Sequence, residues 1–286
     1  MAISFEPLPN NVGVTATGVN VGGLTDDDKD SLYRAFLHNG VMVFRDLALT
    51  MDRHVELSRV FGELEPHPIK SVRHKDVPEI LELKSQPNIE FAVGWHTDLM
   101  YTDTPSGGAV LRPVVIPPEG GQTGWVDTAR VFAALPDRTK QQIVDLRVVM
   151  SYRRLGMKLN AKHSALRGTN TPQDFAEDKN GPLNIEQFPN VTHPLVYKQP
   201  VTGVEVLNVS PVFAESIVGL PQDAGRALLQ ELQDFATREE FVYKHSWREN
   251  DLVVWNNWRT MHRAYPHDHQ YPRILHRTTI KGGKLV

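Results

Sequence analysis

The sequence predicts one α+β domain whose core is a double-stranded β-helix, or jelly roll, with flanking helices and a long insertion or lid. Three observations favour this fold. Short apolar segments of strand length recur along the chain, separated by clusters of Pro, Gly, Asn and Asp. Helical patterns are confined to a few places near the start, the middle and the end. No internal repeat or heptad run is present, which excludes repeat and coiled-coil architectures.

The N-terminal part of the chain is predicted to form a helix, a strand and a second helix. Thr25 and the three aspartates after it indicate a helix N-terminus, because a hydroxyl caps free amides and acids favour the positive end of the helix dipole. The apolar face of this helix consists of Leu32, Phe36 and Leu37. Gly40 ends the helix, residues 41–44 are an apolar run typical of a buried strand, and a second helix follows at about 51–61.

The middle of the chain is predicted to be rich in strands. Strand patterns bounded by turn residues occur at 80–83, 94–98 and 108–115. Residues 128–146 have a helical pattern that Pro136 interrupts. Residues 155–189 are polar and too long for an ordinary connection, so we expect them to form an insertion or a mobile lid.

The last third of the chain is predicted to return to strands after one helix. A strand pattern occurs at 203–209, and a helix begins near Pro221. The apolar face of this helix is expected at Ala224, Leu228, Leu232 and Phe235. Further strands are predicted at 251–255 and 274–280, which completes a chain of short strands with added helices.

Composition and charge limit the kinds of partner. The 286 residues are 40% hydrophobic and 23% charged, as in an ordinary globular protein with a sizeable core. The formal net charge of -3 provides no broad basic surface for nucleic acid or anionic lipid. The absence of cysteine excludes disulfides, thiolate metal sites and cysteine nucleophiles. Because no signal peptide or membrane span is recognisable, we expect a cytoplasmic protein that acts on a small molecule.

The segment Trp95-His-Thr-Asp98 contains the first candidates for chemistry. Side chains two residues apart on a strand point to the same face, so His96 and Asp98 can direct an imidazole nitrogen and a carboxylate oxygen at one point. Alone, such a pair is more often part of an ordinary polar strand edge. The pair therefore needs a third ligand from elsewhere in the chain.

His262 is the best candidate for this third ligand among the 12 histidines. A buried-looking strand leads through a turn into a second strand that carries it. His267 and His269 are less suitable, because residues 266–270 have the composition of a polar loop. Two histidines and one carboxylate form the facial triad that suits iron(II) and leaves three coordination positions open.

Several separated motifs resemble, in order and spacing, the family that includes taurine dioxygenase and the phenoxyacetate herbicide dioxygenases. The motifs are residues 95–98, 120–123, 255–262 and 273–277, with the early segments 40–45 and 61–64. The resemblance covers nearly the whole chain. It implies a jelly-roll enzyme that uses Fe(II), 2-oxoglutarate and O₂, hydroxylates its substrate, and releases succinate and CO₂.

The resemblance also implies roles for individual residues. His96, Asp98 and His262 match the iron ligands of the family. Arg273 matches the arginine that binds the far carboxylate of 2-oxoglutarate, and Thr123 matches the hydroxyl that assists it. A guanidinium suits this role, because it can bind a carboxylate through two parallel hydrogen bonds.

A small anionic substrate is expected from the remaining matches. Arg277 matches a second arginine near the keto-acid end of the cosubstrate and the anionic group of the substrate. His67 matches the histidine that contacts the sulfonate in taurine dioxygenase, and Lys70 is a further candidate cation. Residues 91–94 are apolar and cannot satisfy a buried ammonium, so we expect an alkylsulfonate or an aryl or aryloxy alkanoate rather than taurine. Candidate pocket residues are Phe91, Val93, Leu99, Met100 and Tyr101.

Two other functions stay open from the residues alone. One is a zinc-dependent hydrolase, because the same triad can hold zinc with an activated water. The other is a non-enzymatic jelly-roll binding protein. Thr123 and Arg273 favour the dioxygenase, because a hydrolase has no evident need for a dicarboxylate-binding pair. Members of the family often form dimers or tetramers, so we expect a homo-oligomer.

Overall fold

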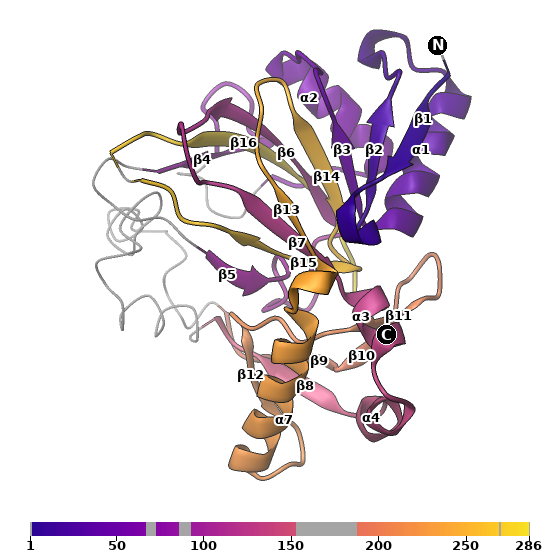
Figure 1. Cartoon of the computed structure of the whole chain (residues 1–286), viewed down its shortest axis with the longest axis vertical. Helices are drawn as coiled ribbons and strands as arrows, with labels where there is room; N and C mark the ends of the chain where they lie inside the picture. The colour runs from indigo at the N-terminus through magenta and orange to yellow at the C-terminus, as the bar shows by residue number, and fades with distance from the viewer. Residues whose placement is uncertain (1, 67–72, 86–92, 153–187, 269, 286) are drawn as a thin grey trace.

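The computed structural model describes residues 2–66, 73–85, 93–152, 188–268 and 270–285. Within these residues the fold is mixed α/β, with mainly sheets and few helices (Figure 1). The predicted insertion or lid at 155–189 lies outside the described residues except for its last two positions, and so do His67, Lys70, Phe91 and His269. No helix in the described ranges has the length and apolar character needed to cross a membrane.

The larger of the two main sheets brings both ends of the chain together. Its order is β1 (Ser4–Pro7), β2 (Val14–Thr17), β3 (Val41–Phe44), β14 (Leu252–Asn256), β6 (Gly108–Val115), β16 (Ile274–Ile280) and β4 (Ile80–Lys84). All neighbours are antiparallel except β2 and β3. Every residue of β3 and β14 is buried, because both faces of the sheet are covered.

Two helices cover the outer face of this sheet, α1 (Asp26–Asn39) and α2 (Met51–Ser58). The predicted start of α1 is confirmed: the Thr25 hydroxyl accepts from the Asp28 amide, and the Asp28 carboxylate accepts from the Thr25 amide. Gly40 ends α1 with a φ of 76°, a conformation that glycine adopts without strain. After α2, a 3₁₀ turn η3 (Arg59–Phe61) completes the second predicted helical segment.

The smaller main sheet has the order β13 (Val242–His245), β7 (Thr123–Asp127), β15 (Thr260–Ala264) and β5 (Val93–His96). It packs against the inner face of the larger sheet through aromatic and branched side chains. The rings of Trp125 on β7 and Trp255 on β14 lie 5.8 Å apart between the two sheets. The space between the sheets is therefore partly core and partly available for a site.

The remaining elements form a second group below the two sheets in Figure 1. They are the helices α3 (Thr128–Ala134), α4 (Asp137–Ile143) and α7 (Gln222–Ala236), with a sheet of β12 (Ala214–Ile217), β8 (Arg147–Met150) and β9 (Val191–Pro194) and a pair of β10 (Val196–Lys198) and β11 (Glu205–Leu207). The other 3₁₀ turns are η1 (Pro9–Asn11), η2 (Val21–Gly23) and η6 (Glu239–Phe241). The predicted interruption at Pro136 is confirmed between α3 and α4.

Three details of the sequence prediction are wrong. The strand expected at 94–98 ends at His96, so Asp98 lies in the turn that follows. Only residues 205–207 of the segment 203–209 form a strand. Ala224 is exposed on α7, because Gly225 and Leu229 extend the buried face in its place. Each error concerns a boundary or a rotation, which local patterns determine weakly.

Candidate active site

A cavity of about 110 Å³ lies between the two main sheets. It is lined by Leu83, Val93, His96, Leu111, Thr123, Trp255, His262, Ala264, Arg273, Leu275 and Arg277. Five residues that the sequence singled out for chemistry are among them. Most of the other lining side chains are aliphatic, so the polar groups share a cavity with an apolar wall.

Two neighbouring strands and a turn bring His96, Asp98 and His262 together. His96 on β5 and His262 on β15 are directly paired in the antiparallel register, and their ring centroids are 4.2 Å apart. The Asp98 carboxylate lies 3.7 Å from His96 Nε2 through one oxygen and 3.8 Å from His262 Nε2 through the other. All three candidate ligand atoms fall within 4.8 Å of one another, so one ion between them can contact all three.

Asn257 holds the turn that carries Asp98, and sequence reasoning did not find it. Its side-chain oxygen accepts from the Asp98 amide at 2.9 Å, and its side-chain nitrogen donates to the Asp98 carbonyl at 2.9 Å. The same nitrogen also donates to the Ser106 carbonyl. Asn257 is completely buried in the turn between β14 and β15, so it ties the aspartate to the hairpin that carries His262.

Hydrogen bonding and burial leave the three side chains in the forms that bind a metal. The Gly94 carbonyl can only accept, so His96 Nδ1 donates the 2.8 Å hydrogen bond between them and the Nε2 lone pair stays available. Burial lowers the pKa of His96 and lowers the pKa of His262 to about 3, so both rings are neutral at neutral pH. Burial alone would raise the pKa of Asp98, but the charge and hydrogen bonds of Arg277, together with His262 and His96, lower it by more, so the carboxylate is ionised.

Arg277 lies directly against the candidate metal ligand. Its Nη1 donates to both oxygens of Asp98 at 3.1 Å. Its Nε is buried without a hydrogen-bond partner among the described residues. The side chain therefore neutralises Asp98 and still has a donor for a further ligand in the cavity.

Arg273 and Thr123 occupy the same cavity, as the resemblance implies. Arg273 is 4% exposed, and its Nε donates to the Gly121 carbonyl at 3.0 Å while its Nη2 lies 3.4 Å from the Thr123 hydroxyl. Burial lowers the pKa of Arg273 to about 10, which leaves the guanidinium charged at neutral pH. A second residue that sequence reasoning missed, Trp247, donates its indole N–H to the Thr123 hydroxyl at 3.1 Å.

The candidate substrate pocket is only partly described. Val93 lines the cavity, whereas Met100 is 1% exposed in the core beneath the main sheets. Tyr101 packs on Phe213 with ring centroids 4.9 Å apart, and Phe213 in turn lies edge-on to the His96 ring at 6.1 Å. Aromatic side chains therefore adjoin the triad.

His267, in the segment 266–270 that was expected to be a polar loop, is buried. This side chain is 7% exposed, and its Nε2 lies 3.1 Å from the Ser85 hydroxyl. Its backbone also forms a bridge with Gly120, next to the turn that receives Arg273. His267 is therefore part of the support of the cavity rather than a surface residue.

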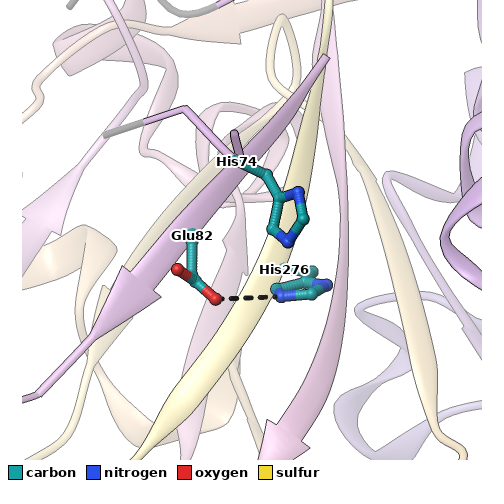
Figure 2. A group of neighbouring side chains, drawn as sticks. All are labelled: His74, Glu82 and His276. Carbon is teal, nitrogen blue, oxygen red and sulfur yellow. Dashed lines mark hydrogen bonds and ion pairs between the residues drawn. The ribbon is translucent and has the colours of Figure 1, made fainter. Parts of the chain in front are cut away.

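A second group of two histidines and a carboxylate lies on the outer face of the larger sheet (Figure 2). It consists of His74, Glu82 on β4 and His276 on β16. The Glu82 carboxylate lies 3.4 Å from His276 Nε2. His276 is adjacent in sequence to Arg277, but successive strand residues point to opposite faces, so this group is separate from the cavity.

Hydrogen bonding gives this second group the wrong tautomers for a metal site. The Asp76 amide donates to His74 Nδ1 at 3.3 Å, and the Arg112 guanidinium approaches His276 Nδ1 at 3.4 Å. Each Nδ1 is therefore an acceptor, and the single proton of a neutral ring lies on Nε2. His276 Nε2–H then donates to Glu82, so we interpret the group as a hydrogen-bonded cluster. In the first group His96 has the opposite arrangement, with Nε2 free for a metal.

A family model and several named relatives that match this chain all indicate the same family. The model of the taurine catabolism dioxygenase TauD, TfdA family matches residues 4–279. An (S)-phenoxypropionate/alpha-ketoglutarate-dioxygenase of Sphingobium herbicidovorans is 29% identical, with 98% of this chain and 96% of the relative covered. An alpha-ketoglutarate-dependent 2,4-dichlorophenoxyacetate dioxygenase of Cupriavidus pinatubonensis is 31% identical, with 86% of each chain covered. An alkylsulfatase of Acinetobacter baylyi is 29% identical over 98% of this chain and 85% of its own.

Solved structures with related names superpose on the whole of this chain. A taurine dioxygenase from Burkholderia xenovorans superposes with a TM-score of 0.81 and 30% identity, covering 100% of this chain and 91% of its own. AAD-2, solved in complex with Mn(II) and N-oxalylglycine, has a TM-score of 0.80 and 26% identity, covering 100% of this chain and 99% of its own. The chain therefore belongs to the TauD, TfdA family and is an oxidoreductase of the alpha-ketoglutarate-dependent dioxygenase class.

Proposed function

We propose that this enzyme binds Fe(II) through His96, Asp98 and His262 and hydroxylates a small anionic substrate, with conversion of 2-oxoglutarate and O₂ to succinate and CO₂. The core that carries the site is proposed to be a double-stranded β-helix. The observation that carries the proposal is the shared cavity: His96 and His262 line one space with a buried, charged arginine and the hydroxyl beside it, and the Asp98 carboxylate lies within 4 Å of both histidines. A metal in the triad supplies dioxygen activation, and the chain supplies position, charge and exclusion of water.

Each polar residue of the cavity has its own role in binding the cosubstrate. Arg273 binds the far carboxylate of 2-oxoglutarate, because its guanidinium is fixed by the Gly121 carbonyl and buried among apolar groups. Thr123 binds the same carboxylate through its hydroxyl. Arg277 holds Asp98 in the ionised form and directs its remaining donors toward the anionic groups of cosubstrate and substrate. The aliphatic wall keeps water away from the reacting groups.

Charge balance supports an anionic primary substrate. A divalent ion, the Asp98 carboxylate, the two carboxylates of 2-oxoglutarate and the two arginines add up to one net positive charge. A substrate with one carboxylate, sulfonate or sulfate group neutralises it, which matters in a cavity with an apolar wall. Relatives named for phenoxypropionate, 2,4-dichlorophenoxyacetate and alkylsulfate chemistry agree with this class.

We favour aryl or aryloxy alkanoates and alkyl sulfonates or sulfates as substrates. The ring of Phe213 adjoins His96, the ring of Tyr101 packs on Phe213, and together they offer an apolar surface for the body of such molecules. His67 and Lys70 stay predictions as contacts to the anionic group. Family membership argues against the two alternatives that the sequence left open, the zinc hydrolase and the non-enzymatic binding protein.

One assay tests the proposed reaction. Anaerobic addition of Fe(II) and 2-oxoglutarate to the purified protein is expected to produce the weak visible charge-transfer band of the chelate. Admission of O₂ with a substrate is then expected to yield succinate in amounts equal to hydroxylated product. Absence of both the band and succinate with every substrate would contradict the proposal, whereas zinc-dependent hydrolysis without O₂ would support the alternative.

A succinate-release screen identifies the substrate class. The panel contains alkyl sulfonates, alkyl sulfates, phosphonates, aryl carboxylates and aryloxy alkanoates, each paired with its uncharged amide or alcohol. We expect turnover with an anionic member and little with its neutral partner. Equal turnover of charged and neutral partners would show that the assignment of an anion-binding pocket is wrong.

A further inference from the structure

The Thr123 hydroxyl receives two hydrogen bonds from groups that can only donate. One comes from the Trp247 indole N–H at 3.1 Å and the other from the Arg273 guanidinium at 3.4 Å. A hydroxyl oxygen has two acceptor positions, and its single hydrogen is its only donor. Both acceptor positions are therefore in use, and the hydrogen must point elsewhere. Because Thr123 lines the cavity, we take that direction to be the cavity.

Trp247 is held firmly enough to set this direction. It is 9% exposed, and its ring lies edge-on to the His245 ring at 4.6 Å and to the Trp125 ring at 6.4 Å. His245 is itself fixed by the Asp251 carboxylate at 3.0 Å and by the Tyr243 hydroxyl at 2.8 Å. The indole N–H therefore has a defined position before any ligand arrives.

The β13–β7 pairing brings the two residues into contact. His245, two residues before Trp247, pairs directly with Thr123 in the antiparallel register. Trp247 follows just after β13, and its indole contacts the side chain of Thr123. The contact thus depends on a strand pair that local sequence does not reveal.

We propose that Trp247 is a positioning residue for the cosubstrate. Its indole N–H, together with Arg273, turns the Thr123 hydroxyl into a donor aimed at the far carboxylate of 2-oxoglutarate. A carboxylate has only acceptor positions, so a hydroxyl oriented as a donor binds it and one oriented as an acceptor repels it. This inference rests on the proposed function, because it assumes a dicarboxylic ligand in the cavity.

The structure provides a matched control for the test. Trp125 lies on β7 two residues from Thr123, is completely buried, and belongs to the same aromatic group. Its indole nitrogen has no hydrogen-bond partner among the described residues. Trp125→Phe therefore removes an indole N–H and ring volume but no hydrogen bond to Thr123. Trp247→Phe removes the same N–H and ring volume and also the hydrogen bond to Thr123.

The experiment measures binding rather than turnover. Calorimetric titration of the Mn(II)-loaded enzyme with 2-oxoglutarate is expected to give a Kd about five- to tenfold higher for Trp247→Phe than for the wild type. This is the size of effect expected when the hydrogen bond from the Thr123 hydroxyl to the carboxylate is weakened. Trp125→Phe is expected to stay within about twofold of the wild type. In a Thr123→Val background, Trp247→Phe is expected to add no further loss, because the hydroxyl that it orients is absent.

Three outcomes overturn the inference. They are an unchanged Kd in folded Trp247→Phe, an equal rise in both tryptophan variants, and an undiminished Trp247→Phe effect in the Thr123→Val background. If Trp247→Phe does not fold, Trp247→Met removes the same donor while filling part of the ring volume. Failure of the wild-type Mn(II) enzyme to bind 2-oxoglutarate would instead contradict the proposed function, so the two failures are distinguishable.

Discussion

At the scale of single residues, the site is organised around the charge of Asp98. Asp98 is 8% exposed, and its carboxylate would be costly to bury alone. Arg277 compensates it through two hydrogen bonds from one nitrogen, and the two neutral histidines leave the negative charge available to a cation. A divalent ion at the proposed site would meet one ionised ligand that is already desolvated, which would strengthen their attraction.

Replacement of Asp98 tests the metal assignment. Asp98→Ala is expected to weaken Mn(II) binding by more than about a hundredfold and to abolish succinate formation, because it removes the one charged ligand. Electron paramagnetic resonance of free Mn(II) measures the binding. Asp103→Ala removes an exposed carboxylate five residues away and should leave it unchanged. Retained Mn(II) affinity in Asp98→Ala would show that the triad is misassigned.

At the scale of elements, the turn before β7 shapes the arginine pocket. Gly121 has a φ of +66°, and its carbonyl accepts from Arg273 Nε. A Cβ atom at this position would lie 3.1 Å from Cδ and Nε of Arg273. The glycine is therefore needed both for the backbone conformation and for the close approach of the guanidinium.

Alanine at Gly121 separates these two needs. Gly203 has a similar φ of +71° but no atom within 4 Å of an added Cβ, so it is a control for backbone strain alone. Both substitutions are expected to lower the free energy of unfolding by about 1 kcal/mol. Only Gly121→Ala is expected to raise the Kd for 2-oxoglutarate, by about tenfold or more, in a calorimetric titration. Equal Kd values in the two variants would contradict the role of Gly121.

The attachment of α2 to the larger sheet depends on a neutral histidine. His54 is completely buried, and its Nε2–H donates to the Val110 carbonyl on β6 at 3.3 Å. Burial, with a contribution from Arg112, lowers its pKa from 6.5 to about 3. Protonation thus favours the unfolded chain: the stability from the neutral ring is present above pH 6.5 and is lost as the pH falls toward 3.

The pH dependence of unfolding tests this attachment. Between pH 7 and pH 5, His54 is expected to cost the wild type about 2 kcal/mol of unfolding free energy. Urea unfolding should show that His54→Gln loses less stability over this range, because glutamine does not titrate. His38→Gln, at an exposed histidine of α1, should behave as the wild type. The same pH dependence in all three proteins would argue against a neutral buried His54.

At the scale of the whole molecule, the cavity lies between two sheets that also meet through an apolar core and through the buried His245–Asp251 contact. Its ligand candidates come from β5, β7 and β15 of the smaller sheet and from β16 and the residue before it in the larger sheet (Figure 1). A bound metal and cosubstrate would therefore connect both sheets. Binding to the folded state alone stabilises it by mass action.

Thermal unfolding measures this connection. Mn(II) and 2-oxoglutarate, each at about 100 times its Kd, are expected to stabilise the protein by about 5.4 kcal/mol, about 2.7 for each ligand, and to raise Tm by roughly 9 °C. Asp98→Ala should show no such rise. A shift of equal size in that variant would mean that the ligands bind elsewhere.

Light scattering on the same samples tests the expected dimer or tetramer.

The sequence alone was sufficient for the family, for the candidate triad and for most elements with a strong local signal. Thr25 with Asp28, and the apolar run 41–44, carry their own capping and burial signals, so their elements were predictable. His96 was first indicated by its spacing from Asp98, whereas Thr123 and Arg273 were found because their motifs resemble a known family in order and spacing. Local capping and burial signals, and motifs shared with a family, can be identified from the sequence without a structure.

Only the tertiary structure decided how these residues are held and protonated. Asn257 and Trp247 act through contacts with residues 159 and 124 positions away, which no periodicity encodes. The tautomer of His96 depends on the Gly94 carbonyl, and the opposite tautomer at His276 depends on Arg112 from another strand. The sequence thus determined which donors the chain possesses. Strand pairing and burial decided which of them can bind a metal, because ionisation and hydrogen-bond direction depend on neighbours brought together by folding.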